Sequence, residues 1–216
     1  MHPALESALD QNDGVLLPGD RAESLVGRGA LQQAVSLGEV LRVRRGVYAH
    51  AAVDREIVRA SRVGGVLAGH SACRLLGLWR LPAPEGDALV VSVPATTGRL
   101  RDPDDPSRPL ARRSGRVRVL HDAQRLDPQR ERLVVGVATC VTQVIRMHSP
   151  ELGLAVLDSS LRLPEHRRPL LNDLREHLPA RCSRVLALAD ARAESGTESI
   201  LRWRLTEAGI PFVIQE

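Results

Sequence analysis

The stretch that decides the fold is ALQQAVSLGEVLRVRRGVY, residues 30–48. Its first part, residues 30–37, repeats apolar residues at helical spacing, and Gly38 follows in the position where glycine commonly ends a helix. Its second part, residues 40–48, alternates apolar and basic residues around a turn at Gly46. This alternation predicts a β-hairpin with a basic face, placed directly after a helix.

Two shorter helices are predicted ahead of this stretch. Residues 4–10 carry leucines four positions apart, and residues 21–26 follow Asp20, a plausible N-cap, and end before Gly27. Three short helices followed by a basic hairpin are typical of a winged helix-turn-helix. In that motif the third helix enters the major groove and the hairpin flanks the phosphates. We therefore expect a DNA-binding domain over residues 1–50.

This interpretation assigns the DNA contacts to two groups of side chains. In the major groove, glutamine can pair with adenine, and arginine with guanine, through two hydrogen bonds each. The candidates for base or groove contacts around the third helix are Arg28, Gln32, Gln33 and Ser36. The candidates on the hairpin are Arg42, Arg44, Arg45 and Tyr48. The alternative interpretation is a small helical domain with a solvated hairpin.

The rest of the chain mixes helices and strands. A helical linker is expected over residues 51–82, with its second helix capped by Ser71, and an α/β domain over residues 83–216. The strands of that domain are predicted at 88–93, 116–120, 133–137 and 210–214. Its main helices are predicted at 139–147, 152–161, 165–177 and 195–208. Residues 95–115 are rich in proline and charge, which predicts a long mobile loop. The expected fold class is α+β.

Arginine is concentrated in the middle of the chain. The 216 residues contain no lysine, and 30 arginines against 26 acids leave a net charge of +4. Residues 99–132 hold 10 arginines and 6 acids, whereas residues 1–50 hold 5 and 6. Every cation is therefore a planar guanidinium, which suits phosphates and guanine edges. We expect a second DNA contact from Arg112, Arg113, Arg116 and Arg118. The alternative is that these residues form a solvated strand and loop.

Composition argues against several other classes of protein. Four aromatic residues are too few for the base-stacking surface of a single-strand binder. Three cysteines without a CxxC spacing (Cys73, Cys140 and Cys182) predict buried reduced thiols and no metal site. No apolar run reaches the length of a membrane span, and no signal-peptide pattern is present. We therefore expect a soluble cytoplasmic protein with no metal, no cofactor and no membrane contact.

A restriction-type nuclease is one catalytic alternative. Such a site needs acids on adjacent strands to hold Mg²⁺, and Glu194 or Glu198 could supply one of them. The strands that would carry the other acids are missing from the sequence that follows. A Ser-x-x-Glu capping box that begins at Ser195 explains Glu198 without catalysis.

A serine hydrolase is the other catalytic alternative. The stretch around Ser71 differs from the G-x-S-x-G elbow at one position, where Cys73 replaces the last glycine. Asp158 with His166 or His177 could complete a triad. However, these residues fall in polar helical stretches, and the parallel βα repeat that supports such an elbow is absent. We therefore assign no catalytic residue and expect a protein that is not an enzyme.

Two sequence elements resemble those of a known family. Residues 38–48 end in Arg-Gly-Val-Tyr, and residues 69–78 begin with Gly-His-Ser-Ala. Together they resemble the AbiEi-type antitoxins, winged-helix repressors common in actinobacteria and their phages. Residues 91–94 are similar to a strand of that family's second domain. Residues 193–202 are similar to the first helix of a Vsr-like, restriction-endonuclease-type domain, here truncated.

The resemblance implies a more specific function than DNA binding. It implies a sequence-specific repressor that binds double-stranded DNA at its own operator and opposes a nucleotidyltransferase toxin without necessarily touching it. A phage immunity-type repressor without a toxin fits the same residues. The alternative from another class is a protein-interaction module in which the winged helix serves only as a scaffold.

Overall fold

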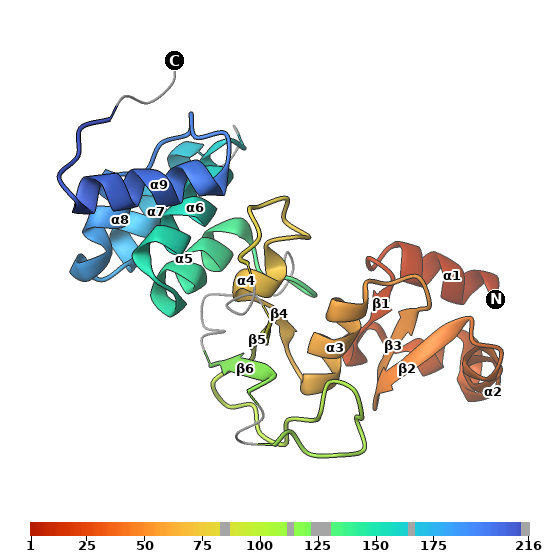
Figure 1. Ribbon diagram of the computed structural model, residues 1–216. Helices are drawn as coiled ribbons and strands as arrows, with labels where there is room; N and C mark the ends of the chain where they lie inside the picture. The colour runs from red at the N-terminus through yellow and green to blue at the C-terminus, as the bar shows by residue number, and fades with distance from the viewer. Residues whose placement is uncertain (83–86, 112–114, 122–130, 164–166, 213–216) are drawn as a thin grey trace.

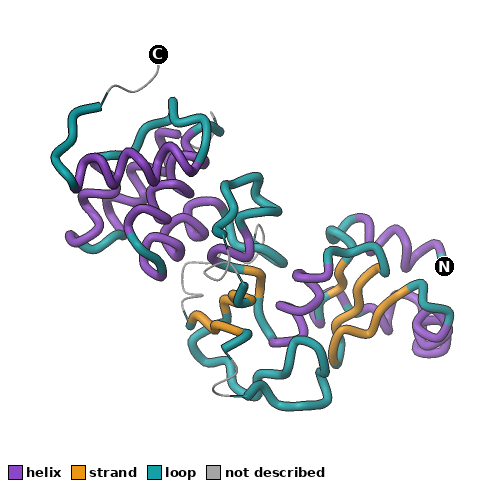
Figure 2. Tube along the Cα trace, in the orientation of Figure 1, coloured by secondary structure: helices purple, strands orange, loops and turns teal. Residues whose placement is uncertain are grey.

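The computed structural model describes residues 1–82, 87–111, 115–121, 131–163 and 167–212. The chain is a mixed α+β protein with two small sheets. Figure 1 shows an N-terminal module, a central sheet and a group of C-terminal helices, following one another from right to left. Strands occur in the first two parts, whereas the C-terminal part consists of helices and loops within the described residues (Figure 2).

The N-terminal module, residues 1–50, packs helices against a three-stranded sheet. Its elements are α1 (Pro3–Asp10), β1 (Val15–Leu16), η1 (Pro18–Asp20), α2 (Ala22–Ser36), β2 (Val40–Arg44) and β3 (Val47–His50). The strands are antiparallel in the order β1-β3-β2, and β2 with β3 forms the predicted hairpin. Leu5, Leu9 and Leu31 are buried in one cluster with Tyr48, because the apolar faces of both helices point onto the sheet.

Helix α2 is broken where the sequence predicts a boundary between two helices. Gly27 has a φ of 79° and a ψ of 153°, outside the helical region, so residues 22–26 and residues 28–36 form separate helical segments. The predicted N-cap role of Asp20 is wrong. Arg21, with a left-handed backbone, takes that position, while the Asp20 carboxylate accepts hydrogen bonds from the Leu17 N–H and from Arg132.

The central sheet joins short segments from three parts of the chain. Its elements are α3 (Arg55–Val63), β4 (Val66–Leu67), α4 (Gly69–Ala72), β5 (Leu89–Ser92) and β6 (Val117–Leu120). The strand order is β4-β5-β6, with β4 antiparallel and β6 parallel to β5. The described C-terminal helices are α5 (Val137–Met147), α6 (Pro150–Leu161), α7 (Arg167–His177), η3 (Ala180–Cys182), α8 (Ser183–Ala187) and α9 (Gly196–Glu207).

The predicted helical linker over residues 51–82 is part of the core. Leu67 in β4 and Ala72 in α4 are fully buried, and a Cβ at Gly65 would lie 2.1 Å from the Ser92 carbonyl oxygen. The chain therefore needs glycine at this close approach of β4 to β5. Ser71 does not cap a helix: its hydroxyl donates to the Ala88 carbonyl and accepts from the Val90 N–H, which ties α4 to β5.

Two strands of the predicted α/β domain are not formed. Residues 133–137 make a single bridge between Val134 and Leu67 before α5 begins. Residues 210–212 are not in a strand, and residues 213–216 lie outside the described part. The predicted nuclease-like end is a helix, α9, that packs along α6 with Ser199, Arg202 and Trp203 buried. Within the described residues, no helix is both long and apolar enough to cross a membrane.

The N-terminal module and the central sheet share a third apolar cluster. Val43, Val47 and Ala49 of the hairpin are buried together with Val58 of α3 and with Leu133. One face of the hairpin is therefore covered by the next part of the chain. Of the arginines that alternate with these residues, Arg42 and Arg45 are exposed and Arg44 is half-buried.

Candidate nucleic-acid interface

The first feature of the site is a groove between residues 28–35 of α2 and the hairpin, which we call the helix groove. It has a volume of about 460 Å³. Its lining consists of Glu23, Arg28, Leu31, Gln32, Val35, Arg42, Arg45, Gly46 and Tyr48. Five of the eight N-terminal residues predicted to contact DNA therefore meet around one depression.

The helical wall of this groove has a clear inner and outer face. Leu31 and Ala34 are buried against the module core, and this orientation leaves Gln32 and Gln33 exposed. Gln33 lies outside the groove lining, as does Ser36, whose hydroxyl donates to the Gln33 carbonyl oxygen at 2.8 Å. The predicted residues of the helix thus share its solvent side without all lining the groove.

The hairpin presents its arginines in two environments. Arg42 and Arg45 are exposed, whereas Arg44 is half-buried, and burial lowers the pKa of its guanidinium. Tyr48, predicted as a hairpin contact, is only 6% exposed and belongs mainly to the module core. It pairs in register with Arg42 on the neighbouring strand, so it forms part of the groove floor.

A second groove lies on the other side of the same arginines, and we call it the arginine groove. It has a volume of about 610 Å³. Its lining consists of Pro18, Arg42, Val43, Arg44, Arg45, Arg99, Arg101, Pro106 and Ser107. Arg42 and Arg45 line both grooves, so the hairpin forms a ridge between them. Arg99 and Arg101 are not among the residues predicted from the sequence to contact DNA, although they open the arginine-rich segment of the chain.

The loop that carries Arg99 and Arg101 makes side-chain contacts with α3 in its described part. Within its described part, Asp104 accepts two hydrogen bonds from Arg59 of α3, at 3.0 and 3.1 Å. Arg62, one turn further along α3, donates to the Pro103 carbonyl oxygen at 3.1 Å. The loop is therefore attached to the helix whose other side is packed beneath the hairpin.

The second predicted DNA contact is not brought to either groove. Arg116 and Arg118 are exposed and Val117 and Val119 are half-buried, so the predicted alternation of this strand is confirmed. Neither arginine lines the helix groove or the arginine groove. The other two members of the predicted cluster, Arg112 and Arg113, lie outside the described residues.

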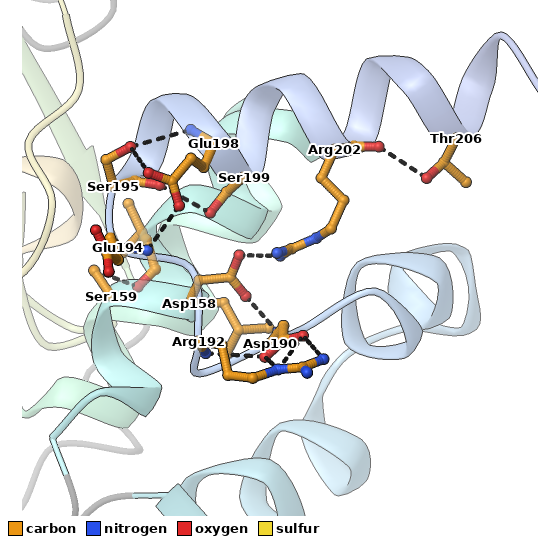
Figure 3. Close-up of polar contacts among 12 residues, drawn as sticks. Asp158, Ser159, Asp190, Arg192, Glu194, Ser195, Glu198, Ser199, Arg202 and Thr206 are labelled. Carbon is orange, nitrogen blue, oxygen red and sulfur yellow. Dashed lines mark hydrogen bonds and ion pairs between the residues drawn. The ribbon is translucent and has the colours of Figure 1, made fainter. Parts of the chain in front are cut away.

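The residues of the predicted capping box have structural partners. The Ser195 hydroxyl accepts from the Glu198 N–H at 3.2 Å, as the capping box predicts, and it also donates to the Glu198 carboxylate. The other carboxylate oxygen accepts from the N–H of Glu194 rather than from that of the N-cap residue itself (Figure 3). Glu198 therefore fastens the start of α9.

The residues considered for a hydrolase triad are also engaged elsewhere. Asp158 is 1% exposed and pairs with Arg202 of α9 (Figure 3). Its second oxygen accepts from the Asp190 N–H at 2.8 Å. His177 pairs with Asp173 at 2.9 Å, Ser71 is bound to the backbone of β5, and His166 lies outside the described residues. Asp158 thus belongs to the packing of the C-terminal helices.

The helix groove and the arginine groove together form the candidate site. They combine exposed glutamine and arginine side chains with a fixed backbone frame, and their neighbours in the loop are fastened to α3. Comparison of the chain with protein-family models, with curated proteins and with solved structures gives no match.

Proposed function

We propose that this chain is a repressor that binds double-stranded DNA sequence-specifically through its N-terminal module. The observation that carries the proposal is the helix groove. There Arg28 and Gln32 of a solvent-facing helix stand opposite Arg42 and Arg45 of a hairpin. Glutamine and arginine are the side chains that read adenine and guanine, and arginines on a hairpin suit phosphates.

The order of elements supports a winged helix-turn-helix. Helix α1 is followed by strand β1, by two helical segments separated at Gly27, and by the hairpin. In such a module the last helix before the hairpin reads the major groove, and here that helix is residues 28–36. Its buried side is occupied by Leu31 and Ala34, which leaves Gln32 and Gln33 free to reach bases.

The acidic residues of the module do not oppose this function as strongly as their number suggests. The module holds six acids and five arginines. Asp20 is paired with Arg132 from outside the module, and Glu39 is paired with the N-terminal ammonium at 2.9 Å. The hairpin arginines, by contrast, have no carboxylate partner within the described residues. The positive charge is therefore concentrated on the hairpin.

The antitoxin role rests on the resemblance of residues 38–48 and 69–78 to AbiEi-type antitoxins. In that form of the proposal, the chain binds its own operator and represses transcription. It opposes a nucleotidyltransferase toxin without necessarily contacting that toxin. A phage repressor without a toxin uses the same groove in the same way. Both forms require sequence-specific binding to duplex DNA, so that property is tested first.

The test is selection of duplexes from a random library by the purified chain. We expect a short sequence motif to be enriched, and a probe that carries the motif to be retained in competition with random duplex. A variant with Arg42→Gln and Arg45→Gln should not enrich the motif. The control variant carries Arg80→Gln and Arg181→Gln, which alter two exposed arginines outside both grooves, and it should still enrich the motif. Selection that yields no motif would overturn the proposal and favour a protein-interaction module.

A further inference from the structure

The arginine groove has two walls that come from different parts of the chain. Arg42, Arg44 and Arg45 belong to strand β2 and its turn, and Arg99 and Arg101 belong to the loop after β5. The segments are separated by more than fifty residues of sequence. Five arginine residues therefore line one depression of about 610 Å³.

The charge of this groove is not neutralised by the described residues. The three acids of the nearby loop have other partners. Asp104 binds Arg59, Asp105 binds Ser107 and Arg108, and Asp102 accepts from the N–H groups of residues 104 and 105. None of the five groove arginines has a carboxylate partner in the part of the chain that the structure describes. Cations gathered in this way repel one another unless an anion lies between them.

Arg44 gives an independent indication that an anion belongs here. Its Nε atom is buried and has no hydrogen-bond partner among the described residues, and burial lowers its pKa. A Cβ at Gly64, whose φ is 121°, would lie 3.1 Å from the Arg44 Nη1 atom. Gly64, at the end of α3, thus leaves room for a desolvated guanidinium that lacks a counter-charge. A buried polar group without a partner is unfavourable, and an anionic ligand would remove that penalty.

The two walls are fixed relative to each other. The hairpin is packed on Val58 of α3, and the loop is attached to the same helix through Arg59. The Arg101 side chain is oriented further by its hydrogen bond to the Ser107 carbonyl oxygen, at 3.3 Å. Because the walls are already in place, an anion would bind without paying for the ordering of a loop.

We propose that the arginine groove binds a phosphodiester of the DNA that the N-terminal helix reads. This proposal rests on the proposed function and adds to it a phosphate contact shared by two parts of the chain. Planar guanidinium groups match two phosphate oxygens at once, which suits a groove lined by arginine alone among charged residues. The contact carries no sequence information, but it fixes the duplex against the hairpin ridge.

The experiment measures the salt dependence of DNA binding for a variant with Arg99→Gln and Arg101→Gln. Each neutralised phosphate contributes about 0.9 to the slope of log K against log salt, so the slope should flatten by about 1–2. Binding should weaken on the selected motif and on random duplex alike, with the motif preference retained. The matched control is Arg80→Gln with Arg181→Gln, which removes two exposed arginines outside the groove lining and should leave the slope unchanged. Circular dichroism and thermal unfolding establish that both variants are folded.

A second arm uses inorganic pyrophosphate as the probe, measured by calorimetry without DNA. The wild type should bind it, and the Arg99/Arg101 variant should bind it at least tenfold more weakly. If the slope and affinity of that variant equal those of the control while the wild type binds DNA, the groove proposal is overturned and the proposed function stands. If the wild type binds pyrophosphate in this groove but no duplex, the DNA function falls and the groove serves free phosphates instead. If the wild type binds neither pyrophosphate nor duplex DNA, both the groove proposal and the proposed function are overturned.

Discussion

Asp20 and Arg132 form an ion pair, 2.6 Å between Asp20 Oδ2 and Arg132 Nη2, that joins the N-terminal module to the segment leading into α5. The two residues are 112 positions apart in the sequence. The same Asp20 oxygen accepts from the Leu17 N–H at 2.7 Å, at the start of the η1 turn. One carboxylate therefore fixes both the turn before α2 and the position of the module on the central sheet.

The first prediction concerns the pH dependence of this pair. Burial acts to raise the pKa of Asp20, but the hydrogen bonds from Arg132 and the Leu17 N–H outweigh it, so the pKa lies below its ordinary value. A carboxyl with a lowered pKa stabilises the fold above its unfolded pKa of about 3.9, and that contribution is lost as the pH falls through the folded pKa. Asp20→Asn should therefore reduce the free energy of unfolding by about 1–2 kcal/mol at pH 7.

Urea unfolding of both proteins at pH 7 and near pH 3 measures this effect. The difference between them should shrink at the lower pH, where the wild-type carboxyl becomes protonated. Glu6→Gln, which alters an exposed acid of α1, serves as the control and should change little at either pH. An equal loss of stability at both pH values would show that Asp20 acts by packing and not by charge.

The second prediction concerns the buried pair of Asp158 and Arg202 (Figure 3). Burial raises the pKa of Asp158 against the opposing effect of its hydrogen bonds, and the Arg202 Nε atom has no partner among the described residues. Asp158→Ala leaves a buried cation unpaired and should reduce the free energy of unfolding by about 3–5 kcal/mol. The double variant Asp158→Leu with Arg202→Met should lose less of the free energy of unfolding, because both charges are removed together. Chemical unfolding of the wild type, the single variant and the double variant measures these differences. A double variant that is less stable than the single variant would contradict this account.

The third prediction concerns the cysteines. Cys73, Cys140 and Cys182 are buried and free, as their spacing in the sequence predicts. The Sγ atoms of Cys73 and Cys140 lie 3.8 Å apart, and their hydrogen bond and burial raise the pKa of Cys140 well above its ordinary range. Because the thiolate is the reactive form, a thiol reagent such as dithionitrobenzoate should label none of the three in the native protein and all three after unfolding. Rapid labelling of Cys140 in the native state would contradict the structure.

Much of the N-terminal module could be predicted from the sequence, because its signals are local. The break at Gly27, the hairpin around Gly46 and the apolar faces of the helices each depend on a few neighbouring residues. The arginine groove could not be predicted, because Arg99 and Arg101 are brought near the hairpin by contacts of their loop with α3, such as the pairing of Asp104 with Arg59. A contact between two residues that are 45 positions apart leaves no periodic pattern in the sequence.

The C-terminal part shows a different limit. The sequence predicts four of its described helices, α5, α6, α7 and α9, to within a few residues, and α9 begins with a clear capping pattern. The short helix α8 is not predicted. The prediction of strands near residues 133 and 210 is wrong within the described residues. A short apolar run is compatible with the start of a buried helix or with a loop as well as with a strand. Asp158 looked like a candidate catalytic acid because the sequence does not show that Arg202 packs beside it.

The fourth prediction separates stability from binding at Arg44. Its half-buried guanidinium lacks a carboxylate partner within the described residues, so Arg44→Met should stabilise the free protein by about 1 kcal/mol and weaken DNA binding. Arg42→Met, on the same strand but exposed, should weaken DNA binding without stabilising the fold. Thermal unfolding and DNA titration of the two variants provide the comparison. A destabilised Arg44→Met protein would show that the guanidinium contributes to packing in the free state.

The central claim is that residues 28–36 read bases while the hairpin holds phosphates, and one set of titrations tests it most directly. Wild type, Gln33→Ala and Arg45→Ala are each titrated with a duplex carrying the selected motif and with a random duplex. Gln33→Ala should lose about 1–3 kcal/mol of binding free energy on the motif and little on random duplex, because Gln33 is exposed on the helix. Arg45→Ala should weaken both by the same factor, because a phosphate contact carries no sequence information. Equal losses for the two variants on both duplexes would contradict the assignment of the reading helix.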